Sequence, residues 1–308
     1  MRLADAILLS LLISFSFGGC RTPEPSVPPP LRRYEPARLL ATLADSRINE
    51  SSGLAASLIR PDLFWTHNDS GDGPVLYAFD RKGRSVGSVE LENTTAEDWE
   101  DMAACRLDGR AYLLAADVGD NSLKRRDYRL HLIAEPLLGR EAVHLKLKPE
   151  MTVRFRYEDG PRNCESVAVD GPARTIVLIS KPLRHGEAAE VYRLPLPKAP
   201  TQKLLIARRI GRLAIPVPTA MDISVDAQRM VVIGYGPAVW MWQRRHAAEP
   251  WAQVLGRPGR RVAEAPLRIQ GESVCFGHDG HSLYLGSEKR PAPLWYQAAR
   301  SPRITSND

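Results

Sequence analysis

A short motif of polar or acidic residues leading into a small apolar run recurs five times along the chain, and this repeat limits the possible folds most. The copies are ESSGLAAS from Glu50, DWEDMAAC from Asp98, NCESVAVD from Asn163, TAMDISVD from Thr219 and QGESVCFG from Gln270. Equivalent apolar positions in the five copies are spaced by 48, 65, 56 and 51 residues. Self-similarity at such a period is typical of repeat architectures.

Each copy is followed by further short β-rich runs, and most units of about 50 residues hold four of them with no long helical period between them. Four short strands per repeat indicate a β-propeller. The last unit has three runs before the tail, and ARLLATLA at residues 37–44 can supply the fourth. Such closure removes exposed strand edges. We therefore predict an all-β propeller of five four-stranded blades over residues 37–298, with a six-bladed ring as the alternative.

The two ends of the chain are predicted to lie outside this domain. Residues 1–20 contain an apolar run too short for a comfortable membrane span and end in FGGC, which resembles a bacterial lipobox with Cys20 as the lipidated residue. A plain secretion signal is the alternative. Residues 21–36 are rich in proline and are expected to form an extended tether of roughly 45 Å. Residues 299–308 are expected to be a disordered tail.

This organisation predicts a location in the cell envelope. Arg21, rather than Asp, follows Cys20, and by resemblance to enterobacterial sorting rules this favours the periplasmic side of the outer membrane. The expected partners are the membrane, through the lipid anchor, and an envelope protein, a glycan or a small molecule; we expect a monomer. The net charge of +6 comes from basic clusters in loops without interleaved aromatic residues, so a nucleic-acid partner is not expected.

Acidic turns are predicted to converge on one face of the ring. Each innermost strand is expected to be antiparallel to the next strand, so the start of the first lies beside the end of the second. Asp69, in HNDSGDG at residues 67–73, lies 17 residues after Ser52, and Asp117, in DVGDNS at 117–122, lies 17 residues after the equivalent Glu100. The carboxylates expected on this face are Glu50, Asp69, Asp72, Asp98, Glu100, Asp101, Asp117, Asp120, Glu165, Asp222, Glu272 and Glu288.

Crowded carboxylates are costly unless cations, hydrogen bonds or raised pKa values relieve them. Ca²⁺ takes six to eight oxygen ligands and would relieve them well. We predict Asp69, Asp72, Asp117 and Asp120 as metal ligands, with Gly71 and Gly119 allowing the backbone to turn. The alternative is that these Asp residues cap their own turns. The predicted ligand-binding residues are His67, Asn68, Trp99, Asn121, Lys181, Glu288 and Lys289.

Carboxylate pairs at the same face are candidates for general acid and base chemistry, or for holding water on a metal. The candidate catalytic residues are Glu100, Asp101, Glu165 and Glu272. The sequence contains neither His-x-x-x-His nor Gly-x-Ser-x-Gly, so a zinc site or an α/β-hydrolase nucleophile is not expected. Cys105, Cys164 and Cys275 lack metal-ligand spacing and are expected to be buried free thiols.

The stretch ESSGLAAS…FWTHNDSGDGPVLYAFDRKGR…DWEDMA…DVGDN, over residues 49–122, resembles a family of exported bacterial propellers of largely unknown function. In outline it is similar to the SdiA-regulated group, and more distantly to the propeller phytases and the gluconolactonase-like propellers. The last two resemblances imply Ca²⁺ held by carboxylates and Asn at the channel mouth. This chain does not reproduce those ligand sets residue by residue.

Two functional hypotheses follow from these observations. The first is a tethered binding module whose acidic mouth holds a cation, a small ligand or an envelope partner. The second is a calcium-dependent hydrolase of phosphoesters or lactones that uses the same mouth. The sequence favours binding, because it offers no complete catalytic constellation.

Overall fold

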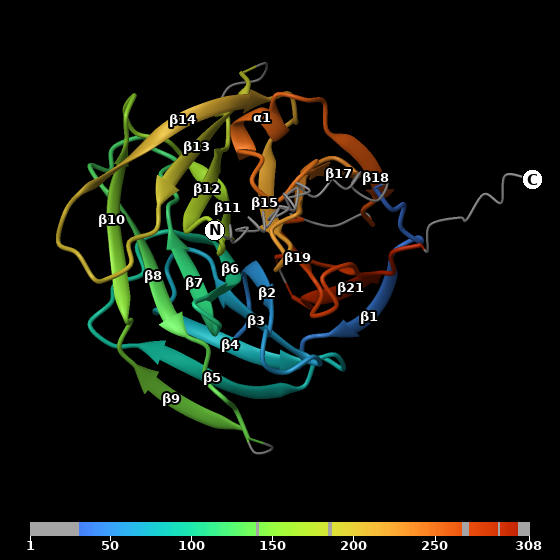
Figure 1. Cartoon of the computed structure of the whole chain (residues 1–308). Coiled ribbons are helices and arrows are strands. Elements are labelled where there is room, and N and C mark those ends of the chain that lie inside the picture. The colour runs from blue at the N-terminus through green and yellow to red at the C-terminus, as the bar shows by residue number, and fades with distance from the viewer. Residues whose placement is uncertain (1–30, 140–141, 184–186, 267–270, 289, 301–308) are drawn as a thin grey trace, which may run out of the picture.

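The computed structural model describes residues 31–139, 142–183, 187–266, 271–288 and 290–300. In this part the chain is built from strands, with one short helix, α1 (Trp251–Leu255), so the predicted all-β class is confirmed. The strands radiate around a common axis in a propeller-like disc (Figure 1). The predicted signal peptide, Cys20 and most of the tether lie outside the described residues. Within those residues, no helix has the length and hydrophobicity needed to cross a membrane.

The first sheet follows the repeat closely. Its strands are β2 (Ser51–Ala56), β3 (Leu63–Asn68), β4 (Val75–Asp80) and β5 (Ser85–Leu91), each antiparallel to the next. A further strand, β9 (Val143–Leu147), pairs in parallel with β5 at the outer edge. This strand comes from the longest of the four spacings, the 65 residues between the second and third copies of the motif.

Two more sets of four strands follow and are joined at their rims. They are β6 (Trp99–Leu107), β7 (Arg110–Asp117), β8 (Tyr128–Ala134) and β10 (Met151–Tyr157), then β11 (Cys164–Asp170), β12 (Thr175–Ser180), β13 (Ala189–Pro195) and β14 (Leu205–Leu213). The two outermost strands, β10 and β14, pair in parallel, and the eight strands therefore form one continuous sheet.

The last two sets complete the disc. They are β15 (Pro218–Ile223), β16 (Arg229–Gly234), β17 (Ala238–Gln243) and β18 (Arg260–Glu264), then β19 (Ser273–Phe276), β20 (Leu283–Gly286), β21 (Pro293–Gln297) and β1 (Arg38–Thr42). The antiparallel pairing of β1 with β21 confirms that ARLLATLA supplies the missing strand. In the preceding unit, the segment WAQVL forms α1 and the segment RRVAEA contains β18, the fourth strand.

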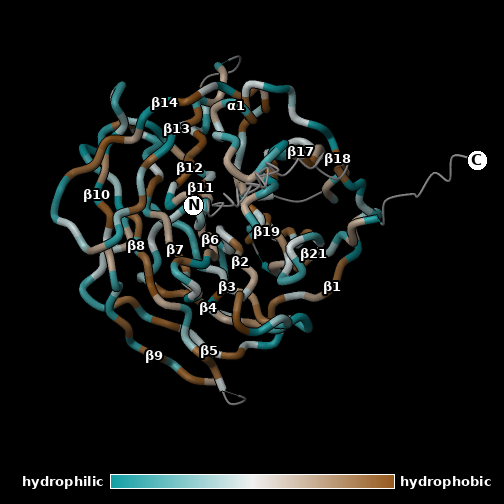
Figure 2. The backbone as a smooth tube through the Cα atoms, in the orientation of Figure 1, coloured by the Kyte–Doolittle hydropathy of each residue, from teal (hydrophilic) through white to brown (hydrophobic). Residues whose placement is uncertain are grey.

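The inner strands β2, β6, β11, β15 and β19 contact one another in cyclic order and close a circle around the axis. Strands near the axis are packed on both faces: every residue of β2 and of β11 is buried. Outer strands such as β10 alternate between buried and exposed residues, since one face meets water. In Figure 2, brown hydrophobic stretches run along many of the strands, and most of the connections at the rim are teal.

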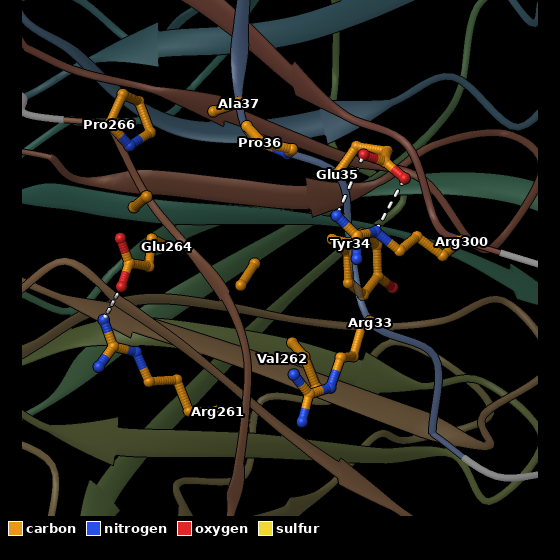
Figure 3. Close-up of a pocket in the computed structure, with 12 residues that line it drawn as sticks. Arg33, Tyr34, Glu35, Pro36, Ala37, Arg261, Val262, Glu264, Pro266 and Arg300 are labelled. Carbon is orange, nitrogen blue, oxygen red and sulfur yellow. Dashed lines mark hydrogen bonds and ion pairs between the residues drawn. The ribbon is translucent and has the colours of Figure 1, made fainter.

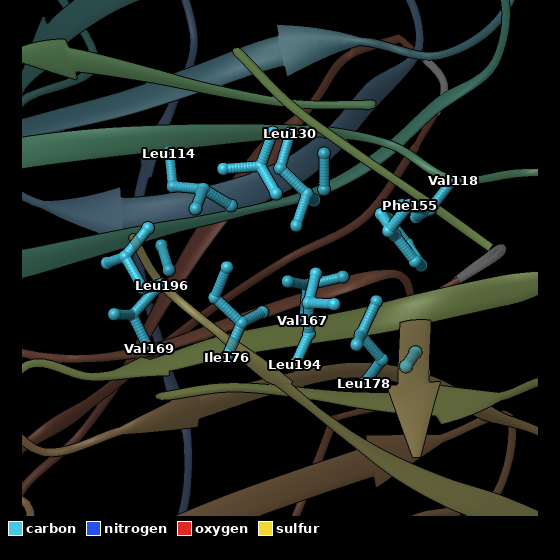
Figure 4. Packing of buried hydrophobic residues seen from close by; sticks show 14 of the residues in the cluster. Leu114, Val118, Leu130, Phe155, Val167, Val169, Ile176, Leu178, Leu194 and Leu196 are labelled. Carbon is cyan, nitrogen blue, oxygen red and sulfur yellow. The ribbon is translucent and has the colours of Figure 1, made fainter. Parts of the chain in front are cut away.

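Hydrophobic side chains fill the spaces between neighbouring sheets. In the largest cluster, Leu114 and Leu130 from one set of strands pack against Ile176 and Leu178 from the next (Figure 4). These side chains are fully buried, and each contributes about 1.5 to 3 kcal/mol relative to exposure. This packing fixes the relative orientation of the sheets, and with it the positions of the loops at their ends.

The chain closes on itself at the rim. Tyr34 forms a bridge with Ala299, and its hydroxyl donates a hydrogen bond of 2.8 Å to the carbonyl of His281. Residues 31–36, which the sequence placed in the tether, therefore pack on the sheets. Beside them a groove of about 640 Å³ runs along β18, bordered by the Arg300–Glu35 and Arg261–Glu264 ion pairs (Figure 3).

Candidate functional site

The segments entering the inner strands lie beside the segments leaving the second strands, as the antiparallel argument predicts. This end of the disc is defined by the last residue pair between the first and second strands of each set. These pairs are Ser51–Asn68, Trp99–Asp117, Cys164–Ser180, Pro218–Gly234 and Ser273–Gly286. We call the group of carboxylates gathered there the acidic face: it comprises Glu50, Asp69, Asp98, Glu100, Glu165, Glu272 and Glu288.

Three members of the acidic face converge closely. Asp69 follows β3, Asp98 precedes β6 and Glu100 lies in β6. One carboxylate oxygen of each lies within 4.8 Å of the other two. We call these residues the carboxylate triad. Oxygen atoms at such spacing suit a single hard cation, because one ion then contacts all three.

Glu100 is the buried member of the triad, with 4 % of its surface exposed. Among the described residues, no hydrogen bond or ion pair reaches its carboxylate; only its main-chain oxygen is bonded, to Ser52 Oγ at 2.6 Å. Burial, reinforced by Glu165 and then Asp69, raises the pKa of Glu100 well above its usual value. A buried carboxylate without a partner is costly, and a bound cation would remove that cost.

The backbone of the DVGDNS turn forms one wall of the triad. A Cβ atom at Gly119 would overlap with the carboxylates of both Asp98 and Glu100, so this position has to be glycine for the two groups to keep their places. Burial and then the charge of Asp69 raise the pKa of Asp98 to about 6. The triad therefore holds its negative charge poorly without an external cation.

A chain of contacts extends from the triad across the acidic face, and we call it the Lys181 chain. The Lys181 ammonium contacts the carboxylate of Glu165 and donates to the hydroxyl of Tyr235 at 3.1 Å. The Tyr235 hydroxyl in turn donates to Glu272 Oε1 at 3.2 Å. Burial disfavours the ammonium, but Glu165 outweighs it and the pKa of Lys181 is raised.

Little positive charge is present to neutralise the carboxylates of the Lys181 chain. Burial raises the pKa of Glu165 to about 7 even though Lys181 lowers it. At the far end, burial and a hydrogen bond with Glu272 raise the pKa of Glu288 to about 9. The acidic face therefore carries protons that a metal ion would displace.

Three of the four predicted metal ligands stabilise their own turns through hydrogen bonds or an ion pair. Asp72 accepts from Gly73 N at 2.8 Å and from the Asn68 amide. Asp120 accepts from Lys124 N at 2.9 Å and from the Tyr128 hydroxyl at 3.0 Å. Asp117 is fully buried and pairs with Arg125 at 2.7 Å. Of the predicted set, the structure brings only Asp69 into the triad.

The two turns are not equivalent because their registers differ. Asp69 lies one residue beyond the end of β3, whereas Asp117 is the last paired residue of β7. The equal count of 17 residues therefore does not place the two side chains alike. The alternative for Asp in turns, that it caps its own loop, describes Asp72, Asp117 and Asp120.

His67, Asn68 and Trp99, which were predicted to contact a ligand, instead form part of the buried framework around the site. His67 is completely buried, and burial lowers its pKa. Its ring packs edge-on against Trp99, whose exposed fraction is 1 %. Asn68 accepts hydrogen bonds from Asn49 N and Glu50 N and so fixes the turn. Trp99 lies between two acidic residues, but its indole packs in a hydrophobic cluster and against the rings of His67 and His131.

The remaining predicted residues divide between the face and the framework. Asn121 accepts a hydrogen bond of 3.1 Å from Asn163, and Lys289 lies outside the described residues. Asp101, a catalytic candidate, is fully buried; it accepts from Met102 N at 2.8 Å and from Val167 N at 2.7 Å, and thereby links β6 to β11. Asp222 links β15 to β19 in the same way through Phe276 N at 2.8 Å.

Glu100, Glu165 and Glu272, the other catalytic candidates, all lie on the acidic face. The sequence did not identify Tyr235 as part of the site. The sequence feature that could have identified Tyr235 is its position in IGYGP, at the end of β16. The acidic turns stand at the ends of their own strands in the same way. Asp98 was placed on the correct face but not among the metal ligands.

Comparisons with known proteins add a similarity of fold. No protein-family model matches the sequence, and no curated protein matches it. Among solved structures, that of U3-55K, a WD40 β-propeller, is similar over 85 % of this chain and 98 % of the other, with 9 % sequence identity and a TM-score of 0.44.

Proposed function

We propose that the protein is a lipid-anchored β-propeller of the bacterial envelope whose acidic face binds a divalent cation, Ca²⁺ first among them. One observation carries the cation proposal: the carboxylate triad, in which Glu100 is buried without a partner. The five sets of four strands and the closed circle of inner strands support a count of five blades.

The donor set favours Ca²⁺ over softer metals. The triad offers carboxylate oxygens, and no histidine or cysteine stands among the three residues. Ca²⁺ accepts such ligands in flexible geometry and fills its remaining positions with water, whereas Mg²⁺ demands near-ideal octahedral geometry. With a divalent ion bound, the three carboxylates and the ion would together carry a net charge of about −1. This arrangement costs far less electrostatic free energy than three carboxylates without a cation.

Binding without catalysis is the function that we favour, and hydrolysis is the second candidate. The hydrolase hypothesis gains support from Glu165, whose raised pKa of about 7 suits a general acid or base. A metal at the triad beside such a group would match the chemistry of phosphoester or lactone hydrolysis. The FGGC segment and the proline-rich residues after it support the envelope location, where the partner would be a protein, a glycan or a small molecule.

Calorimetric titration of Ca²⁺ into the chelator-stripped protein tests the proposal. We expect one ion per chain, and a loss of affinity of about tenfold or more in D69N and in E100Q. D72N is the matched control, since Asp72 lies in the same turn but outside the triad. Absence of binding by the wild-type protein, or equal losses in D69N and D72N, would refute a cation site at the triad. A screen of phosphoesters and lactones on the loaded protein then separates binding from hydrolysis.

A further inference from the structure

The acidic face contains a second group of oxygen atoms, and there a lysine already supplies the positive charge. We infer that Lys181 is a built-in cation occupying a second metal position, which the Glu165 carboxylate and the Tyr235 hydroxyl form and Glu272 borders. Lys181 thereby limits the acidic face to one divalent ion. This inference rests on the proposed cation binding, and its test separates the two.

Glu100 and Glu165 occupy equivalent places in neighbouring blades. Each is the extra residue at a β-bulge in an inner strand, between Trp99 and Asp101 in β6 and between Cys164 and Ser166 in β11. Both residues are 4 % exposed. Glu165 is also the charged neighbour that acts most strongly on Glu100. The fold therefore presents the same ligand twice, one blade apart.

The two positions differ in what neutralises them. In the described part of the chain, no hydrogen bond or ion pair reaches the Glu100 carboxylate, whereas Lys181 contacts Oε1 of Glu165. The other oxygen, Oε2, is buried and has no hydrogen-bond partner among the described residues. Glu165 thus keeps an open lone pair beside the ammonium, as a metal ligand would beside its ion.

Lys181 is held firmly in this position. Its main-chain N–H donates to the carbonyl of Asn163 at 2.9 Å, and its ammonium also donates to the Tyr235 hydroxyl. Tyr235 carries the contact on to Glu272, which interacts with Glu288. An ammonium has three donors and no acceptor, so it satisfies carboxylates but cannot itself bind a metal.

Without the ammonium, the Glu165 carboxylate and the Tyr235 hydroxyl would lose the cation that they share, and Glu272 and Glu288 lie next along the same chain of contacts. This is the kind of all-oxygen donor set that Ca²⁺ accepts. Removal of Lys181 should therefore create a second ion position rather than only strengthen the first. The number of ions bound, not the affinity alone, distinguishes these two effects.

The experiment counts Ca²⁺ ions by calorimetry in the full-length protein. We expect one ion in the wild type, two in K181M, one in K181R, and one again in the double variant K181M/E165Q. The K181R side chain keeps the charge, and the double variant removes a ligand of the new position. Should K181M not fold, K181Q replaces it, since its amide can still donate to Tyr235; circular dichroism verifies the fold of each.

The possible outcomes separate the two proposals. One ion in both the wild type and K181M overturns the role of Lys181 and leaves the triad standing. No ion in the wild type but one in K181M, lost again in the double variant, refutes binding at the triad and supports the lysine position. No ion in any variant refutes both.

Discussion

Gly119 approaches Glu100 so closely that a Cβ atom at residue 119 would overlap with the carboxylate of Glu100. The same added atom would overlap with the carboxylate of Asp98. Both groups are the free ends of flexible side chains, so they can move aside while the backbone keeps its path. Residue 119 therefore controls the geometry of the triad more than the stability of the fold.

The substitution G119A is expected to weaken Ca²⁺ binding by about tenfold or more while the melting temperature changes little. Calorimetry and thermal unfolding measure the two effects. G236A is the matched control: this glycine lies in an equivalent loop of another blade, and a Cβ atom there meets open space. A G119A protein that binds Ca²⁺ as tightly as G236A would show that the triad is not the cation site.

The substitution D101A is expected to destabilise the domain by roughly 3 kcal/mol, because it leaves the buried N–H groups of Met102 and Val167 without acceptors. D101N should cost less than D101A but should still destabilise the domain, because the amide oxygen can accept from only one of these N–H groups while the NH2 group faces the other. Urea unfolding measures both, with the exposed D62A as control. If D101A and D62A lose the same stability, the link from β6 to β11 contributes nothing.

Without a metal ion, the acidic face should make the protein less stable as the pH rises, most clearly from about 7 to 9. Below that range the buried His67 and His131, whose pKa values are lowered, act in the opposite direction. Burial raises the pKa of Asp98 to about 6, of Glu165 to about 7 and of Glu288 to about 9. In the unfolded chain these groups titrate near 4, so the folded state binds protons more tightly. The stability from these protons is complete below pH 4 and is lost as the pH passes the folded values.

Melting temperatures at pH 5, 7 and 9 in a chelator measure this dependence, and added Ca²⁺ should flatten it, because the ion replaces the protons. E288Q should remove the part of the slope nearest pH 9. A melting temperature that rises from pH 7 to pH 9 in the chelator would contradict the electrostatic account of the acidic face.

Removal of residues 1–42 should expose β21 as an open sheet edge and lead to self-association, since an unpaired strand offers free backbone donors and acceptors. Removal of residues 1–30 alone leaves β1 and Tyr34 in place and should have little effect on the domain. Size-exclusion chromatography and thermal unfolding compare the two truncations. A monomeric, equally stable protein that lacks residues 1–42 would show that β1 is dispensable.

Much of the fold could be predicted from the repeat, because inner strands packed on both faces are short, apolar and similar in every unit. The closing strand was predictable for the same reason: the last unit lacked one partner, and residues 37–44 had the matching pattern. The strand β9 was not, since its pairing with β5 joins segments that share no repeat position.

The site was less predictable, because partner choice depends on register and on neighbouring loops. Asp117 differs from Asp69 through Arg125, which comes from the KRR run in its own loop; the turn at Asp69 has no such basic run. That difference could be seen in the sequence. The repeat aligns Glu100 with Glu165, since each is the third residue of its motif copy, but the bulges at these two residues could not be seen, since a bulge changes the pairing without changing the residue pattern.

The bridge between Tyr34 and Ala299 places the beginning and the end of the folded chain side by side. The domain is in effect a circle cut at one point, and the cut lies at the rim, away from the acidic face. A short Gly-Ser linker across the cut and a new opening at the exposed turn of Asp108 and Gly109 would give a circular permutant with every sheet intact. The acidic face is assembled from strand ends all around the circle. It therefore does not depend on the blade in which the chain begins.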